Sequence, residues 1–186
     1  MRLVPVLLLC LSAVACSRTD PASAPAPAVA ADEARPAEVA ATDTQPPAVE
    51  LTASEAAAAT TMSPACNMEN VDGTVVPDMN PIEAKSRQVL VGGWAFDEVN
   101  KTLPAELFVR VYSTSGDGRI WQYQVTQDIE RGDVQATQGR ARVLKSGFHG
   151  SLDLASLDPG KYSLRLSYLR DGALVLCDNG RSVVLN

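Results

Sequence analysis

Residues 88–113 read Gln-Val-Leu-Val-Gly-Gly-Trp-Ala-Phe-Asp-Glu-Val-Asn-Lys-Thr-Leu-Pro-Ala-Glu-Leu-Phe-Val-Arg-Val-Tyr-Ser. Two apolar runs with alternating side chains lie on either side of a polar connection that contains a proline. In the second run Leu107, Val109 and Val111 share one face, because successive side chains of a strand point to opposite sides of its sheet. The stretch therefore predicts two strands at the hydrophobic centre of a small β domain.

The same alternation continues towards the carboxyl end of the chain. Between residues 128 and 145 it lapses, and Asp133 to Gln138 predicts a helical turn that ends at Gly139. Seven or eight short strands with almost no helix predict a mainly β fold, an antiparallel two-sheet sandwich. The further strands are expected near 119–126, 147–154, 161–169, 173–177 and 182–185, with turns at 115–118, 171–172 and 179–180.

Residues 157–168 resemble the region that enters a late strand of immunoglobulin and fibronectin-like domains. In those domains a tyrosine that follows a Pro-Gly turn bonds back to the backbone, and here Tyr162 follows Pro159-Gly160. The resemblance implies an Ig-like sandwich in which the Tyr162 hydroxyl makes this hydrogen bond. The immunoglobulin disulfide bridges two mid-domain strands, whereas the cysteines of this domain lie near its ends.

Residues 1–15 have the layout of a secretory signal, with one arginine, an apolar run of about a dozen residues and small residues at the end. The following Ala13-Val14-Ala15-Cys16 resembles a bacterial lipobox, which implies lipidation of Cys16. Ser17 after the cysteine implies delivery to the outer membrane, facing the periplasm of the cell envelope. The alternative is an ordinary signal peptide cut after Ala15, with Cys16 as a stray thiol.

Residues 16–61 form an Ala/Pro-rich segment with six prolines and no aromatic residue. Such a composition buries too little apolar surface to offset the entropy of ordering, so we expect a disordered tether. Only residues 51–59 favour a transient helix. The tether carries seven acidic side chains against two arginines, a net charge of −5, and is interpreted as a self-repelling spacer.

Residues 62–186 are long enough for one domain with a single core. Their 13 Lys and Arg against 15 Asp and Glu give a net charge of −2, so nucleic-acid binding is not expected. Cys66 and Cys177 predict a disulfide in an oxidising exported compartment. Two distant cysteines and the lone His149 are too few ligands for a metal site, and nothing in the sequence indicates a cofactor.

Four aromatic side chains are candidate binding residues. Phe108 and Tyr112 lie on the face of their strand opposite to Leu107, and Trp121 and Tyr123 share a face one strand later. An exposed pair would form a flat apolar platform for a sugar ring or a protein partner. The alternative is that a second layer covers both faces and that all four side chains are core. Trp94 is expected in the core.

Catalytic chemistry has one candidate centre. His149 would have to act as the base of a small hydrolase, with Ser146 or Ser151 as nucleophile and Asp153 nearby, but neighbours on a strand do not make a triad without an oxyanion hole. The elbow and phosphate-binding glycine motifs are absent from the sequence. The chain is therefore expected not to be an enzyme. Arg131-Gly132-Asp133 spells an adhesion tripeptide that also recurs by chance.

Four short elements occur in a fixed order: Gly93-Trp94-Ala95-Phe96-Asp97, Arg131-Gly132-Asp133-Val134, Ser146-Gly147-Phe148 and Pro159-Gly160-Lys161-Tyr162, closed by Cys177. In this order they resemble a β-sandwich accessory module of bacterial membrane proteins of surface-glycan assembly, over residues 66–184. That module usually carries proline at the position of Gly132. The resemblance implies a sandwich fold and an envelope setting, and it provides no catalytic residues.

The expected function is therefore a non-enzymatic envelope lipoprotein that recognises a protein or a glycan and is held at the membrane by its lipid anchor. The rival expectations are a small hydrolase centred on His149 and a purely structural envelope protein.

Overall fold

The computed structural model describes residues 47–56, 60–76, 80–139, 141–177 and 179–186. The expected signal segment 1–15, the lipidation candidate Cys16 and the tether up to residue 46 lie outside the described residues. All described residues belong to a single folded unit. No helix within it has the length and apolar character needed to cross a membrane.

The described residues are mainly β, which confirms the expected fold class, but they contain twelve strands where seven or eight were expected, because β1 to β5 were not predicted. The strands are β1 (Val49–Glu50), β2 (Thr60–Ser63), β3 (Cys66–Val71), β4 (Thr74–Val75), β5 (Ile82–Glu83), β6 (Gln88–Ala95), β7 (Leu107–Ser113), β8 (Ile120–Ile129), β9 (Gly147–Asp153), β10 (Gly160–Arg170), β11 (Ala173–Cys177) and β12 (Arg181–Leu185). The helical segments are α1 (Ala53–Ala56), α2 (Gly132–Gln138) and a 3₁₀ turn at Ala141–Val143. The opening stretch 88–113 supplies β6 and β7.

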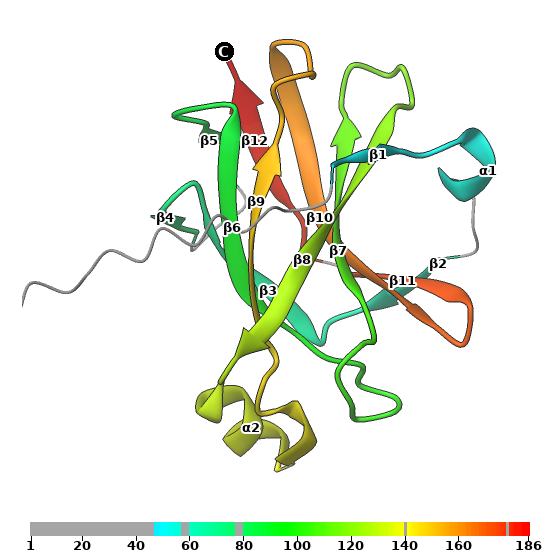
Figure 1. The fold of residues 1–186 in the computed structure, drawn as a ribbon, viewed down its shortest axis with the longest axis vertical. Helices are drawn as coiled ribbons and strands as arrows, with labels where there is room; N and C mark the ends of the chain where they lie inside the picture. The colour runs from blue at the N-terminus through cyan, green and yellow to red at the C-terminus, as the bar shows by residue number, and fades with distance from the viewer. Residues whose placement is uncertain (1–46, 57–59, 77–79, 140, 178) are drawn as a thin grey trace, which may run out of the picture. The chain divides into compact units, whose positions relative to one another are not determined.

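Nine strands follow one hydrogen-bonded path, in the order β2-β11-β10-β7-β8-β9-β6-β3-β4. The long strand β8 joins its two halves: it pairs with β7 from Ile120 to Val125 and with β9 from Thr126 onward (Figure 1). β1 adds to β8, and β12 pairs with both β10 and β5. The two halves of the path are therefore continuous through a single strand.

Two pairings among the described strands correct the expectation of a purely antiparallel arrangement. β2 runs parallel to β11 and β5 runs parallel to β12, so the sheet is mixed. Both are short strands from the amino-terminal part of the domain that pair with strands near its carboxyl end. Alternation along a strand sets the two faces but carries no information on partner or direction, which is why the sequence pattern missed these pairs.

The sheet curls around one main core. Leu107, Val109 and Val111 are buried on the inner face of β7, as the alternation predicts. The predicted disulfide is confirmed: Cys66 on β3 and Cys177 on β11 are joined, with 6.1 Å between their Cα atoms. Since β3 and β11 lie near opposite ends of the strand path, this bond holds the curled sheet closed around its core.

Two local predictions are also confirmed. The Tyr162 hydroxyl donates a hydrogen bond to the carbonyl oxygen of Asp158, at 2.8 Å, four residues upstream. The helical turn expected at 133–138 is α2, and Gly139 ends it in the left-handed conformation with φ of 62°. There the Gly139 N–H donates to the Gln135 carbonyl, the bond that such a cap makes.

The folded unit begins earlier than expected. Within the segment predicted as tether, β1 pairs with β8, α1 follows, and the first residues of β2 pair with β11. Ala48 packs against the main core, and Leu51 is half-buried. An average over the whole Ala/Pro-rich segment hides these apolar residues at its end, so the boundary placed at residue 61 was too late.

Trp94 also differs from its expectation. It is half-buried outside the main core and packs against a smaller cluster of Ala65, Phe96, Val134 and Val143. Its ring stacks on that of Phe96, with 5.9 Å between the ring centres. α2, which carries Val134, lies at the end of β8 in Figure 1.

Candidate functional site

The outer face of β7 carries the candidate binding residues. Phe108, Arg110 and Tyr112 alternate with the buried inner residues and point away from the main core. Phe108 and Tyr112 are half-buried, whereas Arg110 is only 6% exposed. Cross-strand neighbours on this face are Ser167 beside Phe108 and Arg165 beside Arg110, both from β10. The face is therefore partly covered and mixes an aromatic ring with a buried cation.

Trp121 and Tyr123 do not form the expected exposed platform. Both belong to the main core, with exposed fractions of 5% and 1%. The Tyr123 hydroxyl donates to the Asp153 carbonyl at 2.8 Å, and burial raises the pKa of this hydroxyl above its ordinary value. The Trp121 ring meets the edge of Tyr162, and the Arg119 guanidinium lies 4.6 Å from its centre. These two aromatic residues are core, as the alternative interpretation held.

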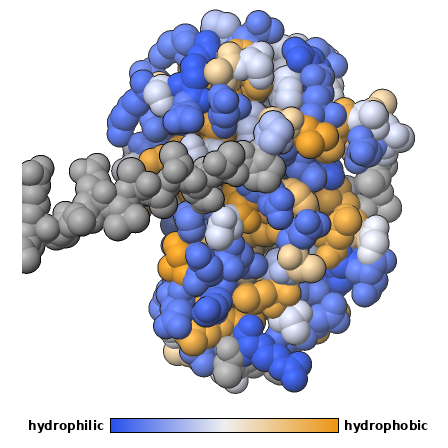
Figure 2. All heavy atoms as spheres, in the orientation of Figure 1, coloured by the Kyte–Doolittle hydropathy of each residue, from blue (hydrophilic) through white to orange (hydrophobic). Residues whose placement is uncertain are grey.

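A pocket of about 380 Å³ opens on the outer face of β7. We call it the β7 groove and define it by the lining residues Leu51, Phe108, Arg110, Ser167, Leu169 and Leu174. Its walls are mostly aliphatic and aromatic, and the carboxylates of Glu55 and Glu106 lie among its lining residues. Apolar surface gathers beside α1 and over the neighbouring sheet in the space-filling view (Figure 2). Tyr112 does not line this groove, although it shares the strand face.

Arg110 is the one buried cation of the groove. Its Nε donates to Gln122 Oε1 at 3.0 Å across the β7–β8 pair. Within the described part of the chain its two terminal nitrogens make no hydrogen bond and no ion pair of 4 Å or less. A guanidinium has five N–H donors, and buried charges are normally paired. Arg110 therefore presents donor capacity that the described protein does not use.

One wall of the groove comes from the segment before β2. Thr52 and Glu55 form a capping box around α1: the Thr52 N–H donates to Glu55 Oε2 at 2.8 Å, and the Glu55 N–H approaches Thr52 Oγ1 at 3.5 Å. Hydrogen bonds from the Thr52 side chain and backbone lower the pKa of Glu55, with a weaker contribution from the Arg110 charge. The capping box thus positions Leu51 and Glu55 over the sheet.

Ser167 is the second under-partnered group. It is completely buried on β10, lines the groove, and its Oγ has no hydrogen-bond partner among the described residues. Leu169, two residues further along the same strand, is 58% exposed at the groove rim. The unpaired Ser167 hydroxyl in the wall and the exposed Leu169 side chain at the rim therefore lie close together on the same strand.

His149, the centre of the hydrolase alternative, lies at an exposed position of β9. Its side chain is 47% exposed on β9, and its Nε2 lies 3.4 Å from Asp128 Oδ1. It lines neither the β7 groove nor the smaller pocket beside α2. Ser146, two residues before β9's Phe148, is completely buried, which is unsuitable for a nucleophile that must meet substrate.

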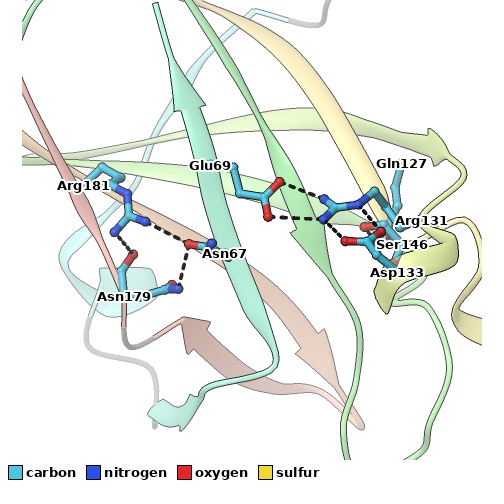
Figure 3. Close-up of polar contacts among 8 residues, drawn as sticks. All are labelled: Asn67, Glu69, Gln127, Arg131, Asp133, Ser146, Asn179 and Arg181. Atoms are coloured by element: carbon cyan, nitrogen blue, oxygen red, sulfur yellow. Dashed lines mark hydrogen bonds and ion pairs between the residues drawn. The ribbon is translucent and has the colours of Figure 1, made fainter. Parts of the chain in front are cut away.

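The charged side chains of the adhesion tripeptide form ion pairs within the protein. Arg131 bonds both oxygens of Glu69, at 2.8 and 3.2 Å, and both oxygens of Asp133, at 2.9 and 2.6 Å (Figure 3). The hydrogen bond from Arg131 lowers the pKa of the Asp133 carboxylate to about 2. The cluster ties the start of α2 to β3, and a second pocket of about 200 Å³ lies beside it, next to Trp94.

A further polar network is structural. Arg181 is 7% exposed and donates to the carbonyls of Met68 and Gly180. It also donates to the Asn67 side chain and to the Asn179 carbonyl (Figure 3). These acceptors lie on β3 and in the turn just before β12. The contrast with Arg110 is direct: one buried arginine has its donors used by the protein, and the other does not.

The comparisons with known proteins add little to this geometry. No protein-family model matches the chain, and no curated protein matches it. Among solved structures, the chain is similar to the endo-β-1,4-mannanase from Thermotoga petrophila, at 17% identity and a TM-score of 0.37. The similarity covers 65% of this chain and 19% of the mannanase chain, so the chain spans about a fifth of that protein. A similarity of this strength carries no argument about function.

Of the four expected binding residues, Phe108 lines the β7 groove, and Tyr112, Trp121 and Tyr123 do not. Sequence reasoning missed Arg110, Ser167, Leu174 and the segment around Leu51. Two signals were present: a charged residue in the middle of an otherwise apolar strand, and the Thr-x-x-Glu pattern of a capping box at residues 52–55.

Proposed function

We propose that the chain is a non-enzymatic lipoprotein of the bacterial cell envelope that recognises a protein or a glycan through the β7 groove. The observation that carries this proposal is the groove itself, in which an aromatic ring and exposed aliphatic surface adjoin a buried arginine with unused donors. Binding sites commonly combine mostly apolar walls with a few converging polar groups. The exposed position of His149, outside both the β7 groove and the pocket beside α2, supports a role without chemistry of its own.

The architecture and location extend the proposal. The curled sheet would be a two-sheet Ig-like sandwich, supported by the Tyr162 hydrogen bond and by the resemblance to accessory modules of surface-glycan membrane proteins. Lipid on Cys16 would hold the domain at the outer membrane, facing the periplasm, with residues 17–46 as the spacer. The lipobox-like sequence supports this location, and mass spectrometry of the mature protein tests it: an unmodified Cys16 would contradict it.

Leu169 and Leu90 provide a matched test of the groove. Both are strand leucines with similar exposure, 58% and 56%, but only Leu169 lines the groove. The mature chain and its L169S and L90S variants are immobilised and used to capture binders from envelope extracts. We expect L169S to lose at least threefold of the specifically captured material and L90S to retain it, because serine removes apolar contact area only at the site.

Treating the extract with protease or with periodate before capture distinguishes a protein ligand from a glycan. Equal capture by the unchanged chain and L169S would show that the groove is not the binding site. An absence of specific capture by all three chains would favour the purely structural role.

A further inference from the structure

Arg110 and Arg165 face each other across β7 and β10 in register, on the outer face of the sheet. Neither makes an ion pair within the described residues. Like charges directly opposite each other destabilise a sheet, and a buried charge without a counterion is costly. The Arg165 guanidinium donates to the Cys177 carbonyl at 3.4 Å, whereas the terminal nitrogens of Arg110 have no acceptor in the described chain. Of the two cations, Arg110 is therefore the one that would gain most from an anion brought in by a ligand.

We propose that the β7 groove binds a peptide segment that presents one carboxylate beside an apolar side chain, with Arg110 as the anchor of the carboxylate. This inference rests on the function proposed above and names the ligand of the same site. Arginine is suited to the role because its planar fork can bond both oxygens of a carboxylate. The buried position of Arg110 excludes most water, which strengthens the interaction relative to an exposed ion pair.

The composition of the walls favours a peptide over a sugar. Leu51, Leu169 and Leu174 are aliphatic, Phe108 is aromatic, and Tyr168 of the main core also lines the groove. A sugar ring presents hydroxyls around its whole edge and would need a matching set of polar partners. Besides the two rim glutamates, the groove offers Arg110, Gln122, Ser167 and the buried hydroxyl of Tyr168 for that purpose.

The chain's own segment illustrates the chemistry that the groove accepts. Leu51 and Glu55, four residues apart, place an aliphatic side chain and a carboxylate at the groove, and the charge of Arg110 already acts on Glu55. Glu55 makes no ion pair with Arg110, because its carboxylate is held by Thr52. A ligand carboxylate could therefore form the ion pair with Arg110 that Glu55 does not form.

The charges at the rim of the groove further restrict which ligands are favoured. Glu55 and Glu106 are both exposed and line the groove, so they repel a second negative charge. The favoured ligand carries one carboxylate next to apolar atoms. That carboxylate could be the free end of a chain or an internal acidic side chain, and the two sources share the same chemistry.

The probe for the first source is N-acetyl-leucine, and its uncharged match is N-acetyl-leucinamide. For the second source the probe is a short peptide with blocked ends and a glutamate four residues after a leucine. Binding to the full mature chain is followed by backbone amide chemical shifts. We expect at least one carboxylate probe to saturate and to shift residues of β7 and β10 around Arg110, and the amide to bind at least tenfold more weakly.

The variant test compares R110M with R165M. Arg165 lies opposite Arg110 in register but does not line the groove. We expect at least a tenfold loss of affinity for the carboxylate probe in R110M and less than about threefold in R165M. A general charge effect would weaken both variants alike and would contradict the proposal. Equal binding of acid and amide would also contradict it, as would preferential binding of glucuronate, which would indicate a sugar.

Two further measurements keep the test decisive if R110M does not fold. In the unchanged chain the Arg110 side-chain Nε–H signal should shift on saturation with the carboxylate probe, and the apparent Kd should rise with salt because the interaction is ionic. An unmoved signal together with a salt-independent Kd would overturn the proposal. If capture from extracts depends on Leu169 while no carboxylate probe binds, only this inference fails and the binding function stands.

Discussion

Asp97 is a carboxylate with 4% exposure in the turn that follows β6. Burial alone would raise its pKa, but the backbone N–H groups of Asn100 and Val99 and the Arg170 guanidinium donate to it and bring the pKa below its ordinary value of 3.8. The observed distances are 3.3, 2.9 and 3.3 Å respectively. The charged form is therefore the one that the fold stabilises, and the turn depends on it.

The sign of the resulting pH dependence follows from this shift. A carboxyl whose pKa is lower in the folded chain contributes stability that is complete above about pH 4 and is lost as the pH falls through the lowered value. We expect D97N to cost about 1–3 kcal/mol at pH 7, and its stability to fall less than that of the unchanged chain between pH 5 and pH 2.5. Denaturant unfolding at each pH measures both.

Glu130 provides the control for this prediction, because it is an exposed acid after β8 that makes no hydrogen bond or ion pair with the described residues. E130Q should follow the unchanged chain across the pH series. Parallel curves for D97N and the unchanged chain would show that the Asp97 carboxylate is not a source of the acid sensitivity.

Individual residues also show which features of the candidate site the sequence could predict and which it could not. Alternation correctly separated Phe108 from Leu107 and set Trp121 and Tyr123 on one face. It did not indicate which faces the folded chain would cover, because that depends on strands and segments distant in sequence. Arg110 entered the sequence analysis only as part of a strand, and its importance comes from the burial and the lack of acceptors that folding creates.

At the scale of elements, the segment from β1 to α1 changes the interpretation of the outer face. It was expected to be tether, yet β1 adds to β8 and the capping box at Thr52 and Glu55 forms a helical turn over the groove. A four-residue helix has no stability of its own in water, so it depends on its cap and on contact with the sheet. This element is expected to open more easily than the strands around it.

Removing the cap tests that expectation. T52A eliminates the side-chain acceptor and donor of the capping box, which is worth about 1 kcal/mol, so we expect faster amide exchange at residues 53–56 with little change in the melting temperature of the domain. S54A is the matched control, since Ser54 is an exposed residue of the same turn whose observed side-chain bond is to Thr52 Oγ1. A large fall in melting temperature in T52A would instead show that the segment is integral to the core.

At the scale of the whole molecule, the sequence predicted the features of the fold that have local sequence signals. The strands β6 to β12, the α2 turn with Gly139 and the pairing of Cys66 with Cys177 follow from short-range signals or from simple counting. The Tyr162 hydrogen bond follows from the resemblance to immunoglobulin-like domains, and β1 to β5 were not predicted. The parallel pairs β2·β11 and β5·β12 and the continuity of the sheet through β8 depend on contacts between distant segments. No periodicity within a strand encodes them.

The disulfide stabilises these long-range contacts by a covalent bond. Cys66 and Cys177 are 111 residues apart in sequence, and their bond joins β3 to β11 near the two ends of the strand path. By the chain-entropy argument, closing so long a loop restricts the unfolded chain enough to stabilise the fold by about 4–5 kcal/mol. Leu174 of the groove lies on β11, three residues before Cys177, so the same bond also supports one groove wall.

Reduction of the mature protein should therefore lower its free energy of unfolding by several kcal/mol, and amide protection should be lost first in β11 and β2, the end of the path that the bond holds. Thiol titration of the denatured, unreduced protein should find neither Cys66 nor Cys177 free. The double variant C66S/C177S is the control: it should match the reduced protein in stability and should not respond to reductant. If reductant leaves the unchanged chain as stable as before, the sheet is closed by its core packing, and the bond is not needed to hold its ends together.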